Sequence, residues 1–290
     1  MRDFTLGIYK LLLTELIKSE YKFMTFAEFM EIRSGKEKLI ILRHDVDKKS
    51  LRSLKTAEME NELQIKGTYY FRVIKNELPR ETIGRIAKMG HEIGYHYDDL
   101  NDAKGIEGKA LELFSKNLAQ MRELVPVKTA CMYGSPLSRY DNRDLWKNFD
   151  YHDLGIIGEP YFDIDFDEVM YLTDTGRRWD GDRVSIRDKV KGDGRWARGD
   201  REERRQKTED RGQKEEDRRG AVGDPPVFNP HSTGDIIKAL KSNMLPDTIM
   251  LTIHPQRWTD NYFFWMKELV WQKIKNGVKY FVARGRGSSQ

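Results

Sequence analysis

The chain has 290 residues and a mass of 34.1 kDa, with 38% hydrophobic and 34% charged residues. Its 51 basic and 47 acidic residues leave a net charge of +4, too small to predict nucleic-acid binding. One cysteine, Cys131, excludes an internal disulfide framework. No run approaches the roughly 18 apolar residues of a membrane span. The longest apolar run near the start, Leu11-Leu12-Leu13, has no cleavage site after it, so we expect a cytoplasmic protein without a transmembrane segment.

A highly charged segment interrupts the second half of the chain. Residues 191–220 hold 11 basic and 9 acidic residues, and their apolar members are Trp196 and Ala197. Such a stretch cannot bury enough surface to offset its ordering entropy. We therefore expect a single domain over 1–290, with N-terminal helices within 1–35 and a disordered insertion at about 191–224. A solvated loop without function is the simpler interpretation, and a basic contact arm is the alternative.

Helical and extended patterns alternate along the rest of the chain. The first helix is expected over 5–18, and the capping box of Thr25 and Glu28 opens a short second one. In chain order there follow a strand at 39–42, a helix at about 50–64, a strand at 68–73, a helix at 79–90, a strand at 92–95, a helix at about 107–124, a strand at 129–132, a short helix at 142–148, strands at 154–157 and 169–172, a helix at 233–242, a strand at 248–253, a helix at 260–276 and a strand at 279–282. This alternation predicts an α/β fold with a parallel sheet, either a barrel or an open doubly wound sheet.

Ligands of such folds bind at the carboxyl ends of the strands, so the residues that follow each strand are the candidates for chemistry. Asp45 and Asp47 follow the first strand, and His96 follows the third. Tyr133 follows the fourth, and His254 ends the strand at 248–253. Three of these four strand ends deliver Asp or His in a chain with only six histidines, which predicts an active site at this edge.

Asp45 and Asp47 are two residues apart, so both side chains point to one side of an extended chain. Two such carboxylates need a cation or a shared proton, which suits one metal ligand and one general base. The alternative is that both cap the next helix. His96 is a candidate nitrogen ligand and His254 a candidate catalytic residue. His91 would lie roughly 16 Å from His96 along the strand, so we expect a structural role for it.

These residues resemble the motifs of the polysaccharide deacetylase family, also called the NodB-homology domain. The first motif is similar to Arg43-His44-Asp45-Val46-Asp47, and the second to Gly90-His91-Glu92-Ile93-Gly94-Tyr95-His96. The late strand that ends in Leu-x-x-His looks like Leu251-Thr252-Ile253-His254. The resemblance spans about residues 36–275 apart from the insertion. It implies an irregular (β/α) barrel of about seven parallel strands and a hydrolase that removes acetyl groups from N-acetylated sugars or cleaves related amide bonds.

The resemblance also implies roles for single residues. Asp45 would be the general base and His254 the general acid, with Asp47 and His96 as ligands of a divalent metal ion, for which we expect zinc. The family's second metal-binding histidine is replaced here by Leu100. Asp98, Asp99 or a water molecule could fill that place, and Asp98 is the nearer of the two if the chain stays extended.

Candidate substrate contacts come from two parts of the chain. Aromatic rings stack on sugars and Arg side chains bind carboxylate or phosphate, whereas the alternative is core tryptophans with surface arginines. The expected partner is an N-acetylated sugar, a sugar nucleotide or a lipid-linked glycan, and not a nucleic acid; the oligomeric state is not predicted. The candidate contact residues are Tyr133, Arg139, Arg143, Arg178, Trp179 and Trp258.

Three other functions are compatible with the same residues. Loss of the second histidine suggests a non-catalytic carbohydrate-binding relative, and a metal-independent amidase is a further alternative. Glycoside hydrolysis by an aspartate pair needs carboxyls about 5–9.5 Å apart on opposite sides of the scissile bond. Asp45 and Asp47 lie on the same side of their strand, so the sequence disfavours that reaction.

Overall fold

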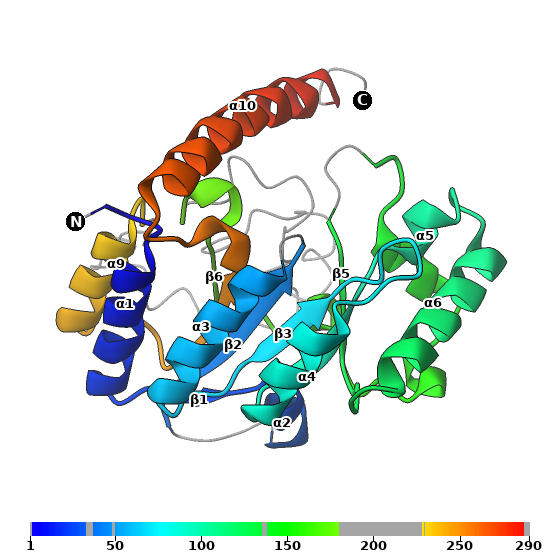
Figure 1. Cartoon of the computed structure of the whole chain (residues 1–290), viewed down its shortest axis with the longest axis horizontal. Helices are drawn as coiled ribbons and strands as arrows, with labels where there is room; N and C mark the ends of the chain where they lie inside the picture. Colours follow the sequence, from blue (N-terminus) through cyan, green and yellow to red (C-terminus); the bar gives the residue numbers. More distant parts are fainter. Residues whose placement is uncertain are drawn as a thin grey trace, which may run out of the picture.

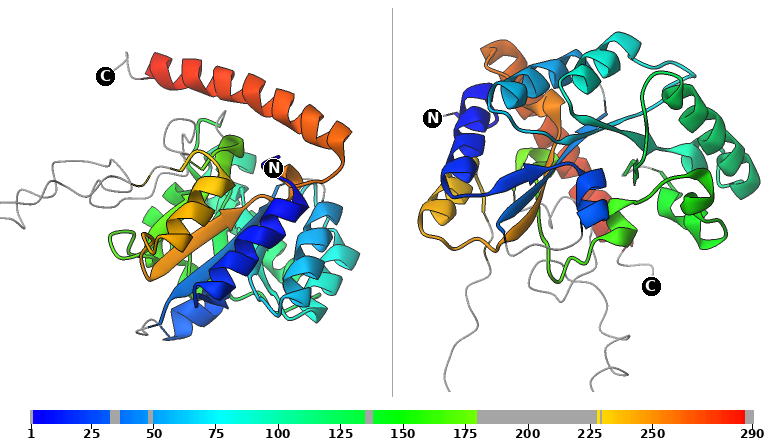
Figure 2. Two further views of the ribbon diagram at one scale, coloured as in Figure 1. Left: turned by 90° about the vertical axis from the view of Figure 1, so that its left-hand side faces the viewer. Right: turned by 90° about the horizontal axis from the view of Figure 1, so that it is seen from below.

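The computed structural model describes residues 2–32, 37–47, 50–134, 138–179, 228 and 230–286. Its centre is a curled sheet of parallel strands in the order β5-β4-β3-β2-β7-β6, with β1 paired to the first part of β2 (Figures 1 and 2). The strands are β1 (Lys22–Met24), β2 (Leu39–Val46), β3 (Thr68–Phe71), β4 (Glu92–Tyr97), β5 (Ala130–Met132), β6 (Met170–Thr173) and β7 (Thr248–Ile253). The expected α/β fold with about seven parallel strands is confirmed, as a half-barrel whose ends are β5 and β6.

Helices connect the strands and cover the outside of the sheet (Figure 1). The α-helices are α1 (Leu6–Lys18), α2 (Phe26–Ile32), α3 (Leu51–Glu62), α4 (Arg80–Lys88), α5 (Asp99–Asp102), α6 (Glu107–Arg122), α7 (Pro160–Asp163), α9 (Thr233–Lys241) and α10 (Tyr262–Arg286). The 3-10 helices are η1 (Asn142–Lys147), η2 (Tyr151–Leu154), η3 (Thr175–Arg177) and η6 (Pro255–Arg257). The predicted capping box is present at α2, where Thr25 N donates to Glu28 at 2.8 Å and Glu28 N donates to Thr25 Oγ1 at 3.1 Å.

Strand β2 is buried along its whole length, and its alternating side chains fall into two sets. Ile40 and Leu42 belong to the core cluster that holds the apolar faces of α1 and α9. Ile41 belongs to a different cluster, inside the curl of the sheet, with Tyr70 and Cys131. Arg43 and Asp45 continue the side of Ile41, so two charged side chains enter the interior of the half-barrel.

Two expected strands are wrong. Residues 151–154 form η2, and Gly155 follows with a φ of 68°, so the chain turns where a strand was expected at 154–157. An isolated bridge between Thr129 and Gly158 is the pairing found nearby. Residues 279–282 continue α10, because Gly277 lies inside this helix instead of ending it. A glycine in a helix interior costs only about 1 kcal/mol.

Two features bear on the remaining expectations from the sequence. The charged insertion predicted at about 191–224 lies outside the residues that the structure describes. Across the described ranges, no helix combines the length and the apolar character needed to cross a membrane.

Candidate active site

The carboxyl ends of the parallel strands lie at one edge of the sheet, and the predicted residues gather there. Asp45 lies near the end of β2, His96 near the end of β4, and His254 directly after β7. His254 lies close enough to Asp45 and Asp47 for its charge to lower the pKa of both carboxyls. Residues more than 200 positions apart in the sequence therefore contribute to one arrangement of charges.

Asp45 is held by Arg43 from the same face of β2. Arg43 Nε donates to one carboxylate oxygen and Nη2 to the other, both at 2.8 Å, and the side chains are almost fully buried. Burial alone would raise the pKa of Asp45, but the Arg43 charge and then the His96 charge overcome this and lower it. The Asp45 carboxylate is therefore ionised and fixed in orientation.

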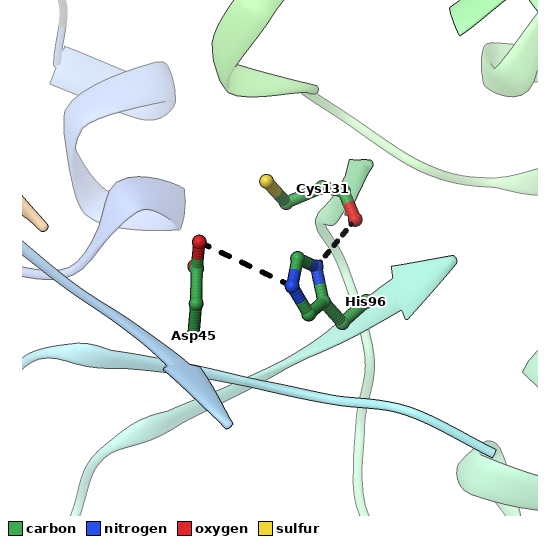
Figure 3. A group of neighbouring side chains, drawn as sticks. All are labelled: Asp45, His96 and Cys131. Atoms are coloured by element: carbon green, nitrogen blue, oxygen red, sulfur yellow. Dashed lines mark hydrogen bonds and ion pairs between the residues drawn. The ribbon is translucent and has the colours of Figure 1, made fainter. Parts of the chain in front are cut away.

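His96 faces the carboxylates of Asp45 and Asp47 with one nitrogen and a carbonyl with the other; Figure 3 shows His96 between Asp45 and Cys131. Its Nδ1 lies 2.9 Å from the carbonyl oxygen of Cys131, so Nδ1 carries a proton and donates it there. Its Nε2 lies 3.7 Å from Asp47 and 4.0 Å from Asp45. Burial would lower the pKa of His96, but Asp45 and Asp47 overcome this and raise it.

Asp47 is the more accessible of the two aspartates, with 22% of its side chain exposed. Gln256 Nε2 donates to its Oδ2 at 3.0 Å, while Oδ1 faces His96. Burial opposes ionisation, but His96, 3.7 Å away, and the charge of His254 lower the pKa of Asp47 well below its usual range. Its carboxylate is a strong candidate to meet a cation that enters from solvent.

The ligand atoms fit a small divalent cation. Two ligands that bind one zinc ion at about 2.0–2.1 Å in tetrahedral geometry lie about 3.3–3.5 Å apart, close to the 3.7 Å between His96 Nε2 and Asp47. A carbonyl acceptor on Nδ1 leaves Nε2 as the ligating nitrogen, which is the usual arrangement at metal sites. Ligand atoms of Asp45, His96 and Cys131 also lie within 4.8 Å of one another. Cys131 was not among the ligands expected from the sequence.

His254 forms a tightly held pair with Asp174, which follows β6. Its Nδ1 lies 2.6 Å from one carboxylate oxygen, and its backbone N donates to the other at 3.0 Å. Arg257 and the Trp258 indole donate to the same carboxylate at 2.7 and 2.6 Å. Burial would raise the pKa of Asp174, but the charges of Arg257 and His254 lower it. Asp174 was not among the residues expected from the sequence; it lies two residues beyond the strand expected at 169–172 and directly after the observed end of β6.

The proposed third ligand, Asp98, is turned to other partners. Its carboxylate accepts from Arg72 Nη2 at 2.5 Å and from Asn142 Nδ2 at 2.9 Å. Leu100 is buried in a small apolar cluster, so its side chain contributes packing at the place of the second histidine. His91 lies at the other end of β4, where its Nδ1 accepts from Gly67 N at 3.2 Å, in agreement with a structural role.

The predicted substrate contacts divide into two groups. Tyr133 lies beside the site, with its ring 5.4 Å from that of His96 and stacked under Arg72 at 3.7 Å. Arg143 pairs with Asp141 at 2.7 Å and lies over the Tyr161 ring, and Arg139 is exposed.

Trp179, Trp258 and Arg178 belong to a different setting. Trp179 and Trp258 are only 3% and 1% exposed and pack in the core cluster of α1 and α9. Their burial corrects the expected sugar stacking, because neither ring offers a free face, and it matches the core alternative. Arg178 lies next to Trp179 and is half-buried.

Comparisons with known proteins add a fold likeness only. No family model matches the chain, and no curated protein matches it. Among solved structures, a family 4 carbohydrate esterase from Bacillus anthracis is similar at 16% identity and a TM-score of 0.35. That similarity covers 51% of this chain and 67% of the esterase chain. Likeness at this level does not establish family membership.

Proposed function

We propose that this chain is a metal-assisted hydrolase that removes the acetyl group from an N-acetylated sugar or a related amide. The observation that carries the proposal is the meeting of two charged groups at one sheet edge: Asp45 and Asp47 around His96, and the Asp174–His254 pair. Amide hydrolysis needs a base for water, positive charge near the carbonyl oxygen and an acid for the leaving amine. The arrangement supports all three roles.

A divalent cation, with zinc expected, would be held by Asp47 and His96, and Cys131 could provide a further ligand. When bound, such an ion polarises carbonyl groups and makes bound water more acidic. The chain's own contribution is to keep both carboxylates ionised. Gln256 fixes one oxygen of Asp47, which leaves the other directed at His96.

Asp45 is the proposed general base. Arg43 keeps the carboxylate ionised and oriented through two hydrogen bonds, so Asp45 can accept a proton from the attacking water. The water oxygen forms a bond to the acetyl carbonyl carbon as its proton passes to the carboxylate. The acetyl C–N bond then breaks, which yields acetate and the free amine of the sugar.

His254 is the proposed general acid for the leaving amine. Asp174 accepts a hydrogen bond from Nδ1 and stabilises the protonated ring, which leaves Nε2 to donate to the nitrogen of the breaking bond. Arg257 and Trp258 donate to the same carboxylate and hold it in place. Both act through Asp174 and not on the substrate.

The proposed substrate is an N-acetylated sugar, free, nucleotide-linked or lipid-linked. Tyr133, Arg139, Arg143 and Arg178 are proposed to contact it, because arginine binds phosphate or carboxylate and an aromatic ring packs on a sugar face. Trp179 and Trp258 are left out of this set, since both are core side chains.

The deciding experiment joins elemental analysis of the purified protein with an acetate-release screen. The screen covers N-acetylated sugars, sugar nucleotides and lipid-linked glycans, each with zinc-loaded and with chelator-treated protein. Acetate release that requires the metal supports the proposal. Full release by metal-free protein identifies a metal-independent amidase instead. Glycan binding by calorimetry without metal uptake or acetate release identifies a non-catalytic carbohydrate-binding protein, the reading that Leu100 favours.

A further inference from the structure

Helix α10 carries an apolar stripe that faces away from the body. Phe263, Val270 and Ile274 recur at helical spacing and are 70%, 50% and 54% exposed. Phe264 and Trp271 lie beside them and are 45% and 53% exposed. An exposed aromatic and aliphatic surface of this extent is uncommon on a soluble monomer and marks an interaction site.

The opposite face of α10 is tied to the rest of the molecule. Trp265 Nε1 donates to the carbonyl of Asp3 at 2.7 Å, and Arg177 donates to the carbonyl of Trp265 at 2.8 Å. Asn261 caps the first turn by accepting from Phe264 N at 3.1 Å. The beginning of the helix is therefore anchored with its stripe outward, and α10 runs across the side of the molecule where the strands end (Figures 1 and 2).

The charge of α10 indicates what the stripe meets. The helix holds one acidic residue, Glu268, against six basic residues, and two of these are exposed: Lys267 within the stripe and Lys273 at its edge. Basic side chains next to exposed aromatic and aliphatic ones are typical of helices that lie in the interface of an anionic bilayer. The six basic residues are Lys267, Lys273, Lys275, Lys279, Arg284 and Arg286.

We propose that α10 docks the protein on an anionic membrane surface. Two other occupants of the stripe are less favourable. A second copy of the chain would bring together two helices of equal positive charge, which repel each other. The chain's own segment 191–220 has Trp196 and Ala197 as its apolar residues, too few to cover the stripe.

Docking through α10 would turn the carboxyl ends of the strands toward the bilayer. Lys267 and Lys273 would meet lipid phosphates while Phe263 and Trp271 enter the headgroup region. If the proposed deacetylase function also holds, the substrate class narrows to glycans carried on a membrane lipid. That narrowing rests on the proposed function, whereas the docking does not.

The test is co-sedimentation of the full chain with vesicles of phosphatidylcholine, with and without phosphatidylglycerol. We expect binding to the anionic vesicles that weakens with salt. Lys267→Gln with Lys273→Gln should weaken it by about 5-fold for each lysine. Val270→Ser with Trp271→Ser should weaken it by about 10-fold or more. Lys109→Gln and Ile106→Ser, exposed positions at the start of α6, are the matched controls and should bind like the unmodified chain.

Three results would overturn the docking: no binding to anionic vesicles at low salt, equal binding to neutral vesicles, or equal loss in the control variants. A dimer in analytical ultracentrifugation that Val270→Ser with Trp271→Ser dissolves would assign the stripe to a second copy instead. Because sedimentation requires no activity, its failure leaves the proposed deacetylase untouched. A failed acetate-release screen, in turn, leaves the docking result standing.

Discussion

The outer and inner faces of the sheet both bring a histidine close to a carboxylate, but the two arrangements serve different purposes. On the outer face, His44 Nε2 lies 2.8 Å from Glu60, which also accepts from Tyr9 at 2.6 Å and from Tyr69 at 2.9 Å. Every oxygen of Glu60 is hydrogen-bonded, and Glu60 and His44 are fully buried. This network is closed and carries no sign of a ligand.

The inner face is open by comparison. His96 Nε2 lies 3.7 and 4.0 Å from two carboxylates, beyond hydrogen-bond length, and Asp47 reaches solvent. The histidines on both faces meet carboxylates, so residue type alone does not tell the two apart. The separation of nitrogen and oxygen does: direct contact closes the outer network, whereas the inner gap has room for a cation.

The largest expected effect distinguishes the two faces through one mutation on each, Asp45→Asn on the inner face and Glu60→Gln on the outer face. Asp45→Asn removes the proposed base and should lower turnover by about 10³-fold or more. It also leaves Arg43 buried without its charge partner, which costs about 3 kcal/mol of stability. Glu60→Gln should destabilise the fold by a comparable amount on the outer face and leave turnover of the folded protein unchanged. The measurements are the turnover of each folded variant and its free energy of unfolding in urea.

The outcome that removes Asp45 from the mechanism is unchanged turnover in Asp45→Asn. Equal loss of turnover in the two variants at a temperature where both are folded would also count against the distinction between the faces. In that case stability and not chemistry would explain the effect.

A second, smaller effect is expected at the Asp174–His254 pair. Asp174→Asn removes the charge that stabilises a protonated His254, so kcat should fall by about 10²–10³-fold with the metal content unchanged. The matched control is Asp150→Asn, since Asp150 lies 2.6 Å from His152 Nδ1 in an exposed pair. We expect no change in kcat for the control. An Asp174→Asn enzyme with normal kcat and a shifted KM alone would contradict the role of the pair in proton donation.

A third prediction concerns the sulfur atom of Cys131. If Sγ is a ligand, cobalt-loaded protein should show an absorption band from thiolate-to-cobalt charge transfer, and Cys131→Ser should abolish it. Metal affinity should fall by about 10–100-fold in the variant, the range measured for weakened metal-site support. A cobalt spectrum without that band in the unmodified protein assigns the ligand set to Asp47, His96 and other oxygen donors.

The sequence predicted the parallel sheet and the strand ends that carry Asp45, His96 and His254 because periodicity and strand termini are local signals. It failed at 154–157, where Leu154 ends the 3-10 helix η2 and Gly155 turns the chain. It also failed at 279–282, where α10 continues through Gly277 to Arg286. In both places the local pattern suits strand and helix alike.

The partners within the site were not predictable in the same way. Asp174 and Cys131 approach the site through the curl of the sheet, from β6 and β5, and no spacing along the chain encodes that approach. Asp98 shows the reverse. Its position after His96 suggested a metal ligand, but its carboxylate oxygens accept hydrogen bonds from Arg72 and Asn142. Trp258, expected at the substrate, is needed in the core to hold Asp174.

The smallest expected effect concerns Asp99, the first residue of α5, which lies against Tyr95 on the outer face of β4 and has no cationic partner among the described residues. Burial raises the pKa of Asp99 to about 7, and hydrogen bonds from Tyr95 and Asn117 only partly oppose this. Because folding raises the pKa, the protonated carboxyl stabilises the fold fully below the ordinary value of 3.8, and this stability is lost as pH rises through about 7. Asp45, whose pKa is lowered by Arg43, acts in the opposite direction and loses its stabilising effect in acid.

The titration of Asp99 should lower the free energy of unfolding by about 2 kcal/mol between pH 5 and pH 8, and Asp99→Asn should abolish this decrease. The variant should melt a few degrees above the unmodified chain at pH 8, and the two should melt closely together at pH 5. Glu159, whose burial also raises its pKa to about 7, titrates in the same window in both proteins, so the difference between their melting curves isolates Asp99. Melting curves that stay parallel across this range would show that Asp99 is ionised in the fold, and that the outer face tolerates a buried charge without a cation beside it.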